Sequence, residues 1–220
     1  MKPITKVEAG QAVYTKRTLA IYDIAVLGVS NRYIWRCSSE RIKEHYNQYV
    51  SANHLDVGVG TGYFLDRCQF PSTSPRIALM DLNPNTLEYA STRISRYEPK
   101  TYKQNILEPV LTTDIQPFDS VGINYLLHCV PGSILDKAVI FDHLKSLMNS
   151  GAVIFGSTIL QGGVSRSWAA KQLMNLYNKK GIFSNTTDDF ASLKDALKQR
   201  FKKVAVEVIG CVALFSGYHY

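Results

Sequence analysis

The sequence predicts an α/β fold, with a mostly parallel sheet and helices on both of its faces. Segments with apolar residues at helical spacing, such as 133–149, separate the predicted strands. The first strand leads into a glycine-rich turn, which is typical of nucleotide-binding α/β sheets. Short apolar runs that indicate buried strands occur at 55–57, 77–81, 118–132 and 152–160.

The turn after the first strand has an unusual spacing of glycines. Gly58, Gly60 and Gly62 follow Asp56 in the pattern D-x-G-x-G-x-G. Glycine adopts backbone angles that other residues avoid, and it lets a ligand lie against the main chain. Tyr63 stands where a dinucleotide fingerprint needs a glycine, and no lysine follows as a P-loop requires. The spacing therefore predicts a nucleoside site of another kind.

The second apolar run ends in an acid. Asp81 follows the glycines by about 20 residues, the distance at which this class of fold places a carboxylate that binds ribose hydroxyls. Asn83 is predicted to cap the next helix, with Pro84 in its first turn. The alternative interpretation of Asp81 is a solvated acid in a turn.

These residues resemble the first two motifs of class I S-adenosylmethionine-dependent methyltransferases. The resemblance implies a Rossmann-like, seven-stranded, mostly parallel sheet with a terminal antiparallel strand and an N-terminal helical lid. It also implies S-adenosylmethionine as the cofactor. The cofactor-binding residues would be Asp56, Gly58, Val59, Gly60, Gly62, Asp81, Leu82, Asn105, Ile106 and Asn124.

Two later segments extend the resemblance. Residues 105–109, NILEP, are similar to the family's third motif, which implies that Asn105 meets the adenine amino group while Ile106 packs on the ring. Residues 118–132 are similar to the fourth motif, which brings residues to the reacting methyl group. Asn124 and Tyr125 would lie near the carboxyl end of that strand, on the face where open α/β sheets bind ligands.

His128 is the candidate catalytic residue. It follows Tyr125 by three positions, and an ordinary histidine pKa near neutrality suits a general base that removes a proton from the acceptor. The alternative is a histidine that lines the pocket or hydrogen-bonds the strand end, in an enzyme that works by proximity alone.

The N-terminal segment is predicted to form two helices, at 14–27 and 38–50, joined by a loop after Gly28. The stretch YDIAVLGVSNRYIWR resembles the N-terminal region of methyltransferases that act on quinones and phospholipid headgroups, where such helices fold over the cofactor. An alternative for the aromatic residues is half-buried packing. The substrate-pocket residues implied are Tyr22, Asn31, Trp35, Arg36 and Tyr125.

The chain is interpreted as a single domain over residues 1–220. Its parts are an N-terminal lid at 1–50, a cofactor-binding core at 51–160, substrate-side helices at 161–203 and a terminal β-hairpin at 204–220. Turn and cap positions are assigned to Gly151 after the 133–149 helix, to Ser165 and to Thr187 or Asp188 before the late helices, and to Gly210 in the hairpin.

Composition limits the alternatives. No apolar run is long enough to span a bilayer, and the N-terminus lacks a signal-peptide pattern. The four cysteines form no C-x-x-C pair, so we expect no metal site and no disulfide, and a reducing cytoplasm is the simplest location. The net charge of +7 is spread without a long basic tract, which disfavours nucleic acid and leaves peripheral membrane contact open.

The function implied is methyl transfer to an oxygen or nitrogen of a small, partly apolar acceptor. The segment NYLLHC lacks the proline pair of enzymes that methylate exocyclic amines of nucleic-acid bases. Three alternatives remain: an RNA or protein methyltransferase, a non-catalytic S-adenosylmethionine-binding protein, and a cyclisation assisted by the bound sulfonium. The sequence carries no indication of oligomeric state.

Overall fold

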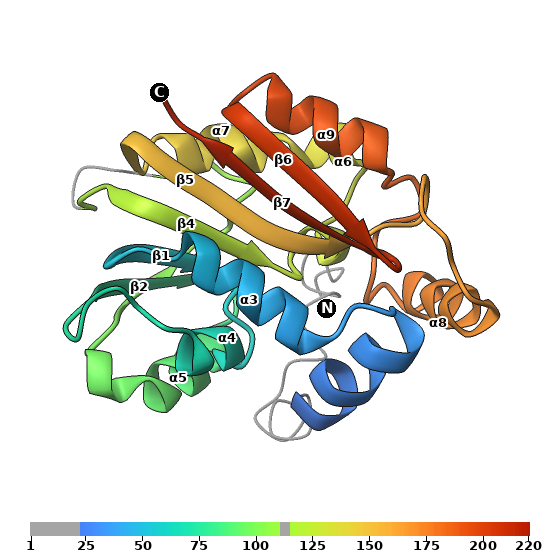
Figure 1. Ribbon diagram of the computed structural model, residues 1–220, viewed down its shortest axis with the longest axis horizontal. Coiled ribbons are helices and arrows are strands. Elements are labelled where there is room, and N and C mark those ends of the chain that lie inside the picture. The colour runs from blue at the N-terminus through green and yellow to red at the C-terminus, as the bar shows by residue number, and fades with distance from the viewer. Residues whose placement is uncertain (1–22, 111–114) are drawn as a thin grey trace, which may run out of the picture.

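The computed structural model describes residues 23–110 and 115–220, with the backbone alone for 24–26. These residues form one seven-stranded sheet in the order β3-β2-β1-β4-β5-β7-β6 (Figure 1). Strands β1 to β5 pair in parallel, and β7 is antiparallel to both β5 and β6, which confirms the implied fold. The strands are β1 Asn53–Val57, β2 Arg76–Asp81, β3 Lys100–Lys103, β4 Phe118–Asn124, β5 Met148–Ile159, β6 Lys202–Ile209 and β7 Val212–Tyr218.

Helices cover both faces of the sheet (Figure 1). Helices α3, α4 and α5 pack on one face, and α6, α7 and α9 pack on the other. None of the helices in the described ranges is long and apolar enough to cross a membrane. The helices are η1 Asp23–Ile34, α3 Ser39–Tyr49, α4 Tyr63–Arg67, α5 Pro84–Arg93, η2 Ser95–Tyr97, η3 Leu127–Cys129, α6 Ile134–Lys137, α7 Val139–Lys145, α8 Trp168–Lys179 and α9 Phe190–Lys198.

Strand β2 is a continuous apolar run whose side chains pack alternately into two hydrophobic cores. Ile77 and Leu79 face the core under α3 and α5, while Ala78 and Met80 face the core under α6 and α7. A strand that is buried on both faces reads as an unbroken apolar run, because alternate side chains point to opposite faces. The same rule explains why the sequence indicates β1, β2 and β5 clearly. It also explains why the short, polar edge strand β3 gave no comparable signal.

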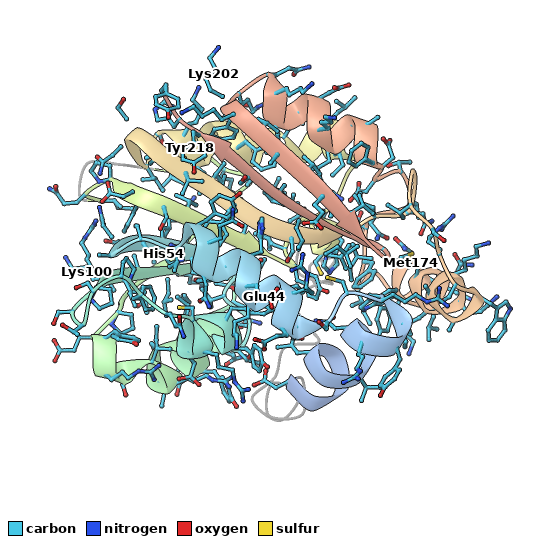
Figure 2. The ribbon with its side chains drawn as sticks, viewed as in Figure 1. Glu44, His54, Lys100, Met174, Lys202 and Tyr218 are labelled. Atoms are coloured by element: carbon cyan, nitrogen blue, oxygen red, sulfur yellow. The ribbon has the colours of Figure 1, made fainter. Side chains whose placement is uncertain are left out.

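A third apolar cluster joins η1 and α8 at the end of the sheet. It includes Leu27 from η1, Trp35 from the segment after it, and Met174 from α8. Figure 2 labels Met174. Trp35 is 1% exposed, and its ring centroid lies 5.9 Å from that of Phe183. This cluster attaches the N-terminal segment to α8 and β7.

The N-terminal helix differs from the prediction. Residues 14–22 lie outside the described residues, and the predicted loop after Gly28 is helical as far as Ile34. The helix has a wide π-type turn, in which the Trp35 N–H donates to the Ser30 carbonyl at 2.9 Å. Tertiary contacts support it, since Leu27 and Asn31 are both buried. Packing has outweighed the local preference of Gly28 for a break.

The predicted helix at 133–149 is also shorter than expected. It divides into α6 and α7 and ends at Lys145, and β5 begins at Met148. Gly151 therefore lies inside β5 rather than after a helix, with φ of 83° at an irregularity in the pairing with β4. Its N–H donates to the His219 carbonyl, so pairing with the C-terminus extends the strand.

The residues that cap the helices agree with the prediction only in part. Asn83 caps α5 as predicted, and Ser38 caps α3. Helix α8 uses Ser167 rather than Ser165, and α9 uses Asp189 rather than Thr187 or Asp188.

Asp188 is instead half of a buried ion pair. The Lys137 ammonium donates to its Oδ2 at 2.6 Å and to the Ser184 carbonyl at 2.7 Å. The two side chains are 1% and 0% exposed, and Oδ1 of Asp188 has no hydrogen-bond partner. Burial raises the pKa of Asp188 to about 6, and the positive charge of Lys137 opposes that shift.

We expect Lys137→Met to lower the free energy of unfolding by about 3–5 kcal/mol, because it leaves a buried carboxylate without its cation. Urea denaturation followed by circular dichroism measures this change. Lys198→Met, at the exposed end of α9, is the matched control and should change stability by less than about 0.5 kcal/mol. Equal midpoints for the two variants would contradict the structural role of the pair.

Candidate active site

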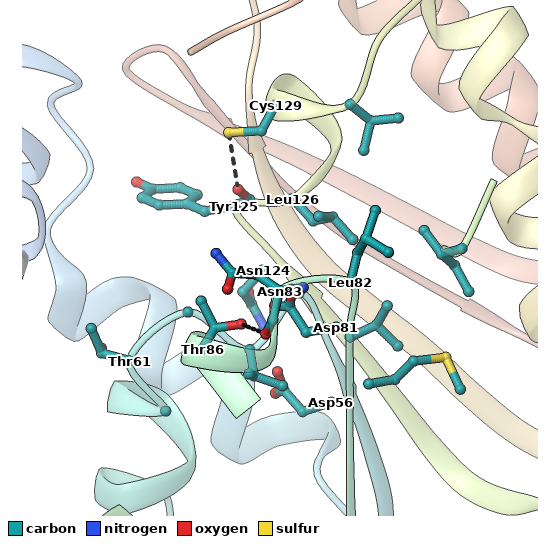
Figure 3. A pocket seen from close by; sticks show the side chains of 18 of the residues that line it. Asp56, Thr61, Asp81, Leu82, Asn83, Thr86, Asn124, Tyr125, Leu126 and Cys129 are labelled. Atoms are coloured by element: carbon teal, nitrogen blue, oxygen red, sulfur yellow. Dashed lines mark hydrogen bonds between the residues drawn. The ribbon is translucent and has the colours of Figure 1, made fainter. Parts of the chain in front are cut away.

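A cavity opens at the carboxyl ends of β1, β2 and β4, where the chain order of the sheet reverses beside β1 (Figure 3). Such a reversal is where open α/β sheets bind their ligands. All ten predicted cofactor-binding residues line this cavity, together with Tyr125. Several further residues line the cavity that the sequence did not assign to a site, among them Leu27, Thr61, Asn83, Thr86, Gln104, Leu126, Cys129, Val130 and Pro131.

The three glycines of the turn have different tasks. All have positive φ, of 71° at Gly58, 53° at Gly60 and 69° at Gly62. A Cβ at Gly58 would lie 2.8 Å from Cδ1 of Leu126, and one at Gly62 would lie 3.1 Å from Cβ of Ala90. A Cβ at Gly60 would meet nothing within 4 Å. Gly58 and Gly62 therefore permit close packing, whereas Gly60 exposes bare main chain to the cavity.

Asp81 lies at the end of β2 in the cavity wall (Figure 3). Its Oδ1 accepts the Asn83 N–H at 2.8 Å. Burial raises the pKa of this carboxyl group to about 6, although hydrogen bonds from Asn83 and Thr86 favour the charged form. Near neutral pH the group is a carboxylate that accepts hydrogen bonds from a ligand.

The segment after β3 forms another part of the wall. The Asn105 Nδ2 donates to Oε1 of Glu108 at 2.9 Å, and its Oδ1 accepts the Leu107 N–H at 3.2 Å. Ile106 is buried, and its carbonyl lies 2.8 Å from Nδ1 of His143. These contacts fix a short loop that presents one amide and one apolar side chain to the cavity.

Asn124 supplies a polar group at the end of β4. Ser157 on β5 donates its hydroxyl to Oδ1 of Asn124 at 2.9 Å. The Nδ2 of Asn124 is buried and has no hydrogen-bond partner. Since an unpaired buried donor is costly, this amide is suited to an acceptor on a bound ligand.

The candidate substrate residues are only partly brought together. Tyr125 lines the cavity, with φ of 56°, and its hydroxyl donates to Oδ1 of Asn31 at 2.9 Å. Asn31, Trp35 and Arg36 do not line it: Asn31 and Trp35 are buried beside it, and Arg36 is exposed. Tyr22 lies outside the described residues. Asn31 therefore acts behind Tyr125, while Trp35 fits the packing alternative.

His128 does not line the cavity. It lies in η3 and is 3% exposed, and its Nδ1 accepts the Ile159 N–H at 3.3 Å. Burial, with a smaller contribution from the charge of Lys137, lowers the pKa of His128 to about 3. A group with this pKa is a weak proton acceptor at neutral pH. The geometry therefore does not favour the predicted general-base role and agrees better with the alternative, a histidine that hydrogen-bonds a strand.

Thr61 connects the glycine turn to the N-terminal helix. Its hydroxyl donates to Oδ1 of Asp23 at 2.6 Å, and Oδ2 of Asp23 accepts from Arg93 at 2.6 Å. This link could not be predicted from local patterns, because Asp23, Thr61 and Arg93 belong to three separate elements. The link attaches η1 to the turn beside the cavity.

Comparison with known proteins agrees with this site. Residues 55–154 match a family described as a methyltransferase domain. The chain is 42% identical over 209 residues to demethylluteothin O-methyltransferase of Streptomyces thioluteus, covering 95% of this chain and 90% of that protein. It is 36% identical over 218 residues to the physcion biosynthesis cluster O-methyltransferase of Aspergillus chevalieri, covering 99% and 98%.

A solved structure shares the fold. The N-methyltransferase NodS of Bradyrhizobium japonicum WM9, in complex with S-adenosyl-L-homocysteine, aligns with a TM-score of 0.60 at 12% identity, covering 92% of this chain and 97% of that one. The glycine turn, the acid that ends β2 and the close relatives lead to one conclusion: the chain belongs to the class I S-adenosylmethionine-dependent methyltransferases.

Proposed function

We propose that this enzyme transfers a methyl group from S-adenosylmethionine to a hydroxyl oxygen of a small, partly apolar acceptor, with an aromatic hydroxyl as the best fit. The observation that carries the proposal is the composition of the cavity. Its lining combines the bare Gly60 main chain and the Asp81 carboxylate with apolar groups such as Leu27 and Val130. The names of the two relatives above, both O-methyltransferases, support oxygen as the acceptor atom.

The residues of the cavity fit the cofactor. Gly60 leaves space for a nucleoside against the main chain, and Asp81 accepts hydrogen bonds from ribose hydroxyls. Asn105 and Ile106 would meet the adenine, one by its amide and one by packing. The unpaired Nδ2 of Asn124 would donate to an oxygen of the methionine moiety. These contacts would use five of the ten residues that the sequence assigned to this cofactor.

The protein's contribution to the reaction is mainly orientation. The cofactor supplies a methyl group on a positively charged sulfur, which is already activated for transfer. Leu27, Leu126, Val130 and Pro131 give the acceptor end an apolar wall that excludes water. Tyr125, held by Asn31, fixes one side of that wall. Alignment of this kind supplies about 7–11 kcal/mol of a barrier for a two-reactant step.

How readily the acceptor hydroxyl loses its proton determines which class of hydroxyl suits this site. With a pKa of about 3, His128 does not compete for a proton at neutral pH. An acceptor that ionises readily, such as a phenol, needs less help than an alkyl alcohol. This argument favours an aromatic hydroxyl, and an aromatic amine is the nitrogen counterpart.

The proposal is tested with methyl-labelled S-adenosylmethionine and four sets of acceptors: phenols, aromatic amines, total RNA and cell protein. We expect label in methyl ethers of phenols, with release of S-adenosylhomocysteine. Label in RNA or protein would replace the proposal by the polymer alternative. Binding of S-adenosylhomocysteine without transfer to any set would favour the non-catalytic alternative.

We expect Gly60→Ala to weaken S-adenosylhomocysteine binding by at least about tenfold, because its Cβ would occupy the ligand's space. Titration calorimetry measures the affinity. Gly151→Ala is the matched control: its φ is also positive and its Cβ would also meet nothing within 4 Å, but it lies outside the cavity. Both variants carry similar backbone strain, of about 1–2 kcal/mol. Equal affinities for the two would contradict the role of Gly60.

Cofactor binding should weaken as the pH falls through 6. Burial raises the pKa of Asp81 to about 6, and ribose hydroxyls donate to its charged form, so binding is strongest above that pH. We expect about a tenfold loss of affinity for S-adenosylhomocysteine between pH 7.5 and pH 5. Asp81→Asn should bind more weakly at pH 7.5 and lose most of this pH dependence. An unchanged slope in the variant would assign the titration to another group.

A further inference from the structure

A chain of buried polar residues lies behind Asp56, on the side away from the cavity. The Tyr46 hydroxyl on α3 donates to Oδ2 of Asp56 at 2.6 Å, and its oxygen lies 2.7 Å from Nε2 of His54. The His54 Nδ1 lies 2.8 Å from the Ser120 hydroxyl, which accepts the Ser51 N–H at 2.9 Å. Tyr46, His54 and Ser120 are all 0% exposed. Figure 2 shows His54 at the sheet beside α3.

The donor and the acceptor in the two hydrogen bonds of Tyr46 follow from the groups involved. A tyrosine hydroxyl has one proton, and the carboxylate of Asp56 only accepts, so Tyr46 donates to Asp56. The Tyr46 oxygen then accepts from Nε2–H of His54, and Nδ1 of His54 pairs with the Ser120 hydroxyl. His54 thereby fixes the direction in which Tyr46 donates.

Neighbouring residues on β4 and β5 pack against these hydrogen-bonded side chains. The Tyr46 ring packs edge-on against Phe155, with centroids 5.1 Å apart and planes at 89°. On β4, a Cβ at Gly122 would lie 3.1 Å from Cε1 of His54 and 3.2 Å from Oδ2 of Asp56. Gly122 therefore gives these two side chains their space.

We propose that Tyr46 and His54 are positioning residues, which orient the Asp56 carboxylate to bind the positively charged α-amino group of the cofactor. This inference rests on the proposed cofactor site. Asp56 is 6% exposed and lines the cavity, and Tyr46 occupies its Oδ2, which leaves Oδ1 for a ligand. A carboxylate buried with neutral neighbours is stabilised by a cation. An ammonium group forms a charge-assisted hydrogen bond with it when the carboxylate plane is correctly set.

Two ligands separate positioning from a general structural role. S-adenosylhomocysteine carries the α-amino group, and 5′-methylthioadenosine lacks the whole amino-acid part. We expect Tyr46→Phe to weaken S-adenosylhomocysteine binding by about tenfold and to leave 5′-methylthioadenosine within about twofold. Titration calorimetry on the full chain gives both affinities. Equal losses for the two ligands would overturn the inference, because a distorted site would weaken both.

Further variants test whether an effect of Tyr46→Phe arises from its hydrogen bond to Asp56. Tyr49→Phe removes a hydroxyl from the same helix, where the Tyr49 ring also packs on Phe155, and should bind both ligands as the natural protein does. Asp56→Asn should weaken S-adenosylhomocysteine selectively, and adding Tyr46→Phe to it should cause little further loss. A further tenfold loss in the double variant would show that Tyr46 acts independently of Asp56, against the inference.

The same variants distinguish a wrong positioning role for Tyr46 from a wrong contact between Asp56 and the cofactor. If Asp56→Asn weakens neither ligand, the proposed contact between Asp56 and the cofactor is wrong. If Asp56→Asn is selective and Tyr46→Phe is not, the contact stands and the positioning role is wrong. Should Tyr46→Phe fail to fold, His54→Gln takes its place: it keeps Tyr46 and Asp56, and a selective loss for S-adenosylhomocysteine supports the role while an equal loss refutes it.

Discussion

The close approach of the glycine turn to its neighbours is the constraint on which the rest of the site depends. Gly58 lies against Leu126 after β4, and Gly62 lies against Ala90 of α5; a Cβ at Gly58 would force Leu126 to move, and one at Gly62 would be tightly packed against Ala90. These two contacts bring the ends of β1 and β4 and the start of α4 together. Gly60, between them, is left facing the cavity. Packing on both sides of the turn thus creates a bare stretch of main chain where a nucleoside fits.

Three polar side chains of the cavity are each oriented by a hydrogen bond from a neighbouring residue. Tyr46 holds Asp56, Ser157 holds Asn124, and the Asn83 N–H holds Asp81. Each of the three groups still lines the cavity. A side chain that is oriented before a ligand arrives loses less conformational freedom on binding. Two of the holding residues, Tyr46 and Ser157, lie outside the cavity wall.

Helix η1 completes the cavity through two polar attachments and one apolar contact. Asp23 at its start binds Thr61 and Arg93, and Asn31 near its end binds Tyr125. Leu27, between them, lines the cavity. Both attachments end on residues of the cavity wall, Thr61 and Tyr125. The position of the helix and the shape of the cavity are therefore coupled.

The ten residues assigned to the cofactor could be located from the sequence, because they belong to short motifs at strand ends, and all of them line one cavity. The glycine spacing, the acid after β2 and the segments 105–109 and 118–132 each place their residues through local geometry. Other features depend on contacts between residues far apart in the chain. The role of Asp188 depends on Lys137, which is 51 positions away. The location of His128 depends on its burial against β5, and η1 continues through Gly28 because distant contacts support it. Interactions between residues far apart in the chain leave no periodic trace in a sequence, so local patterns could not reveal them.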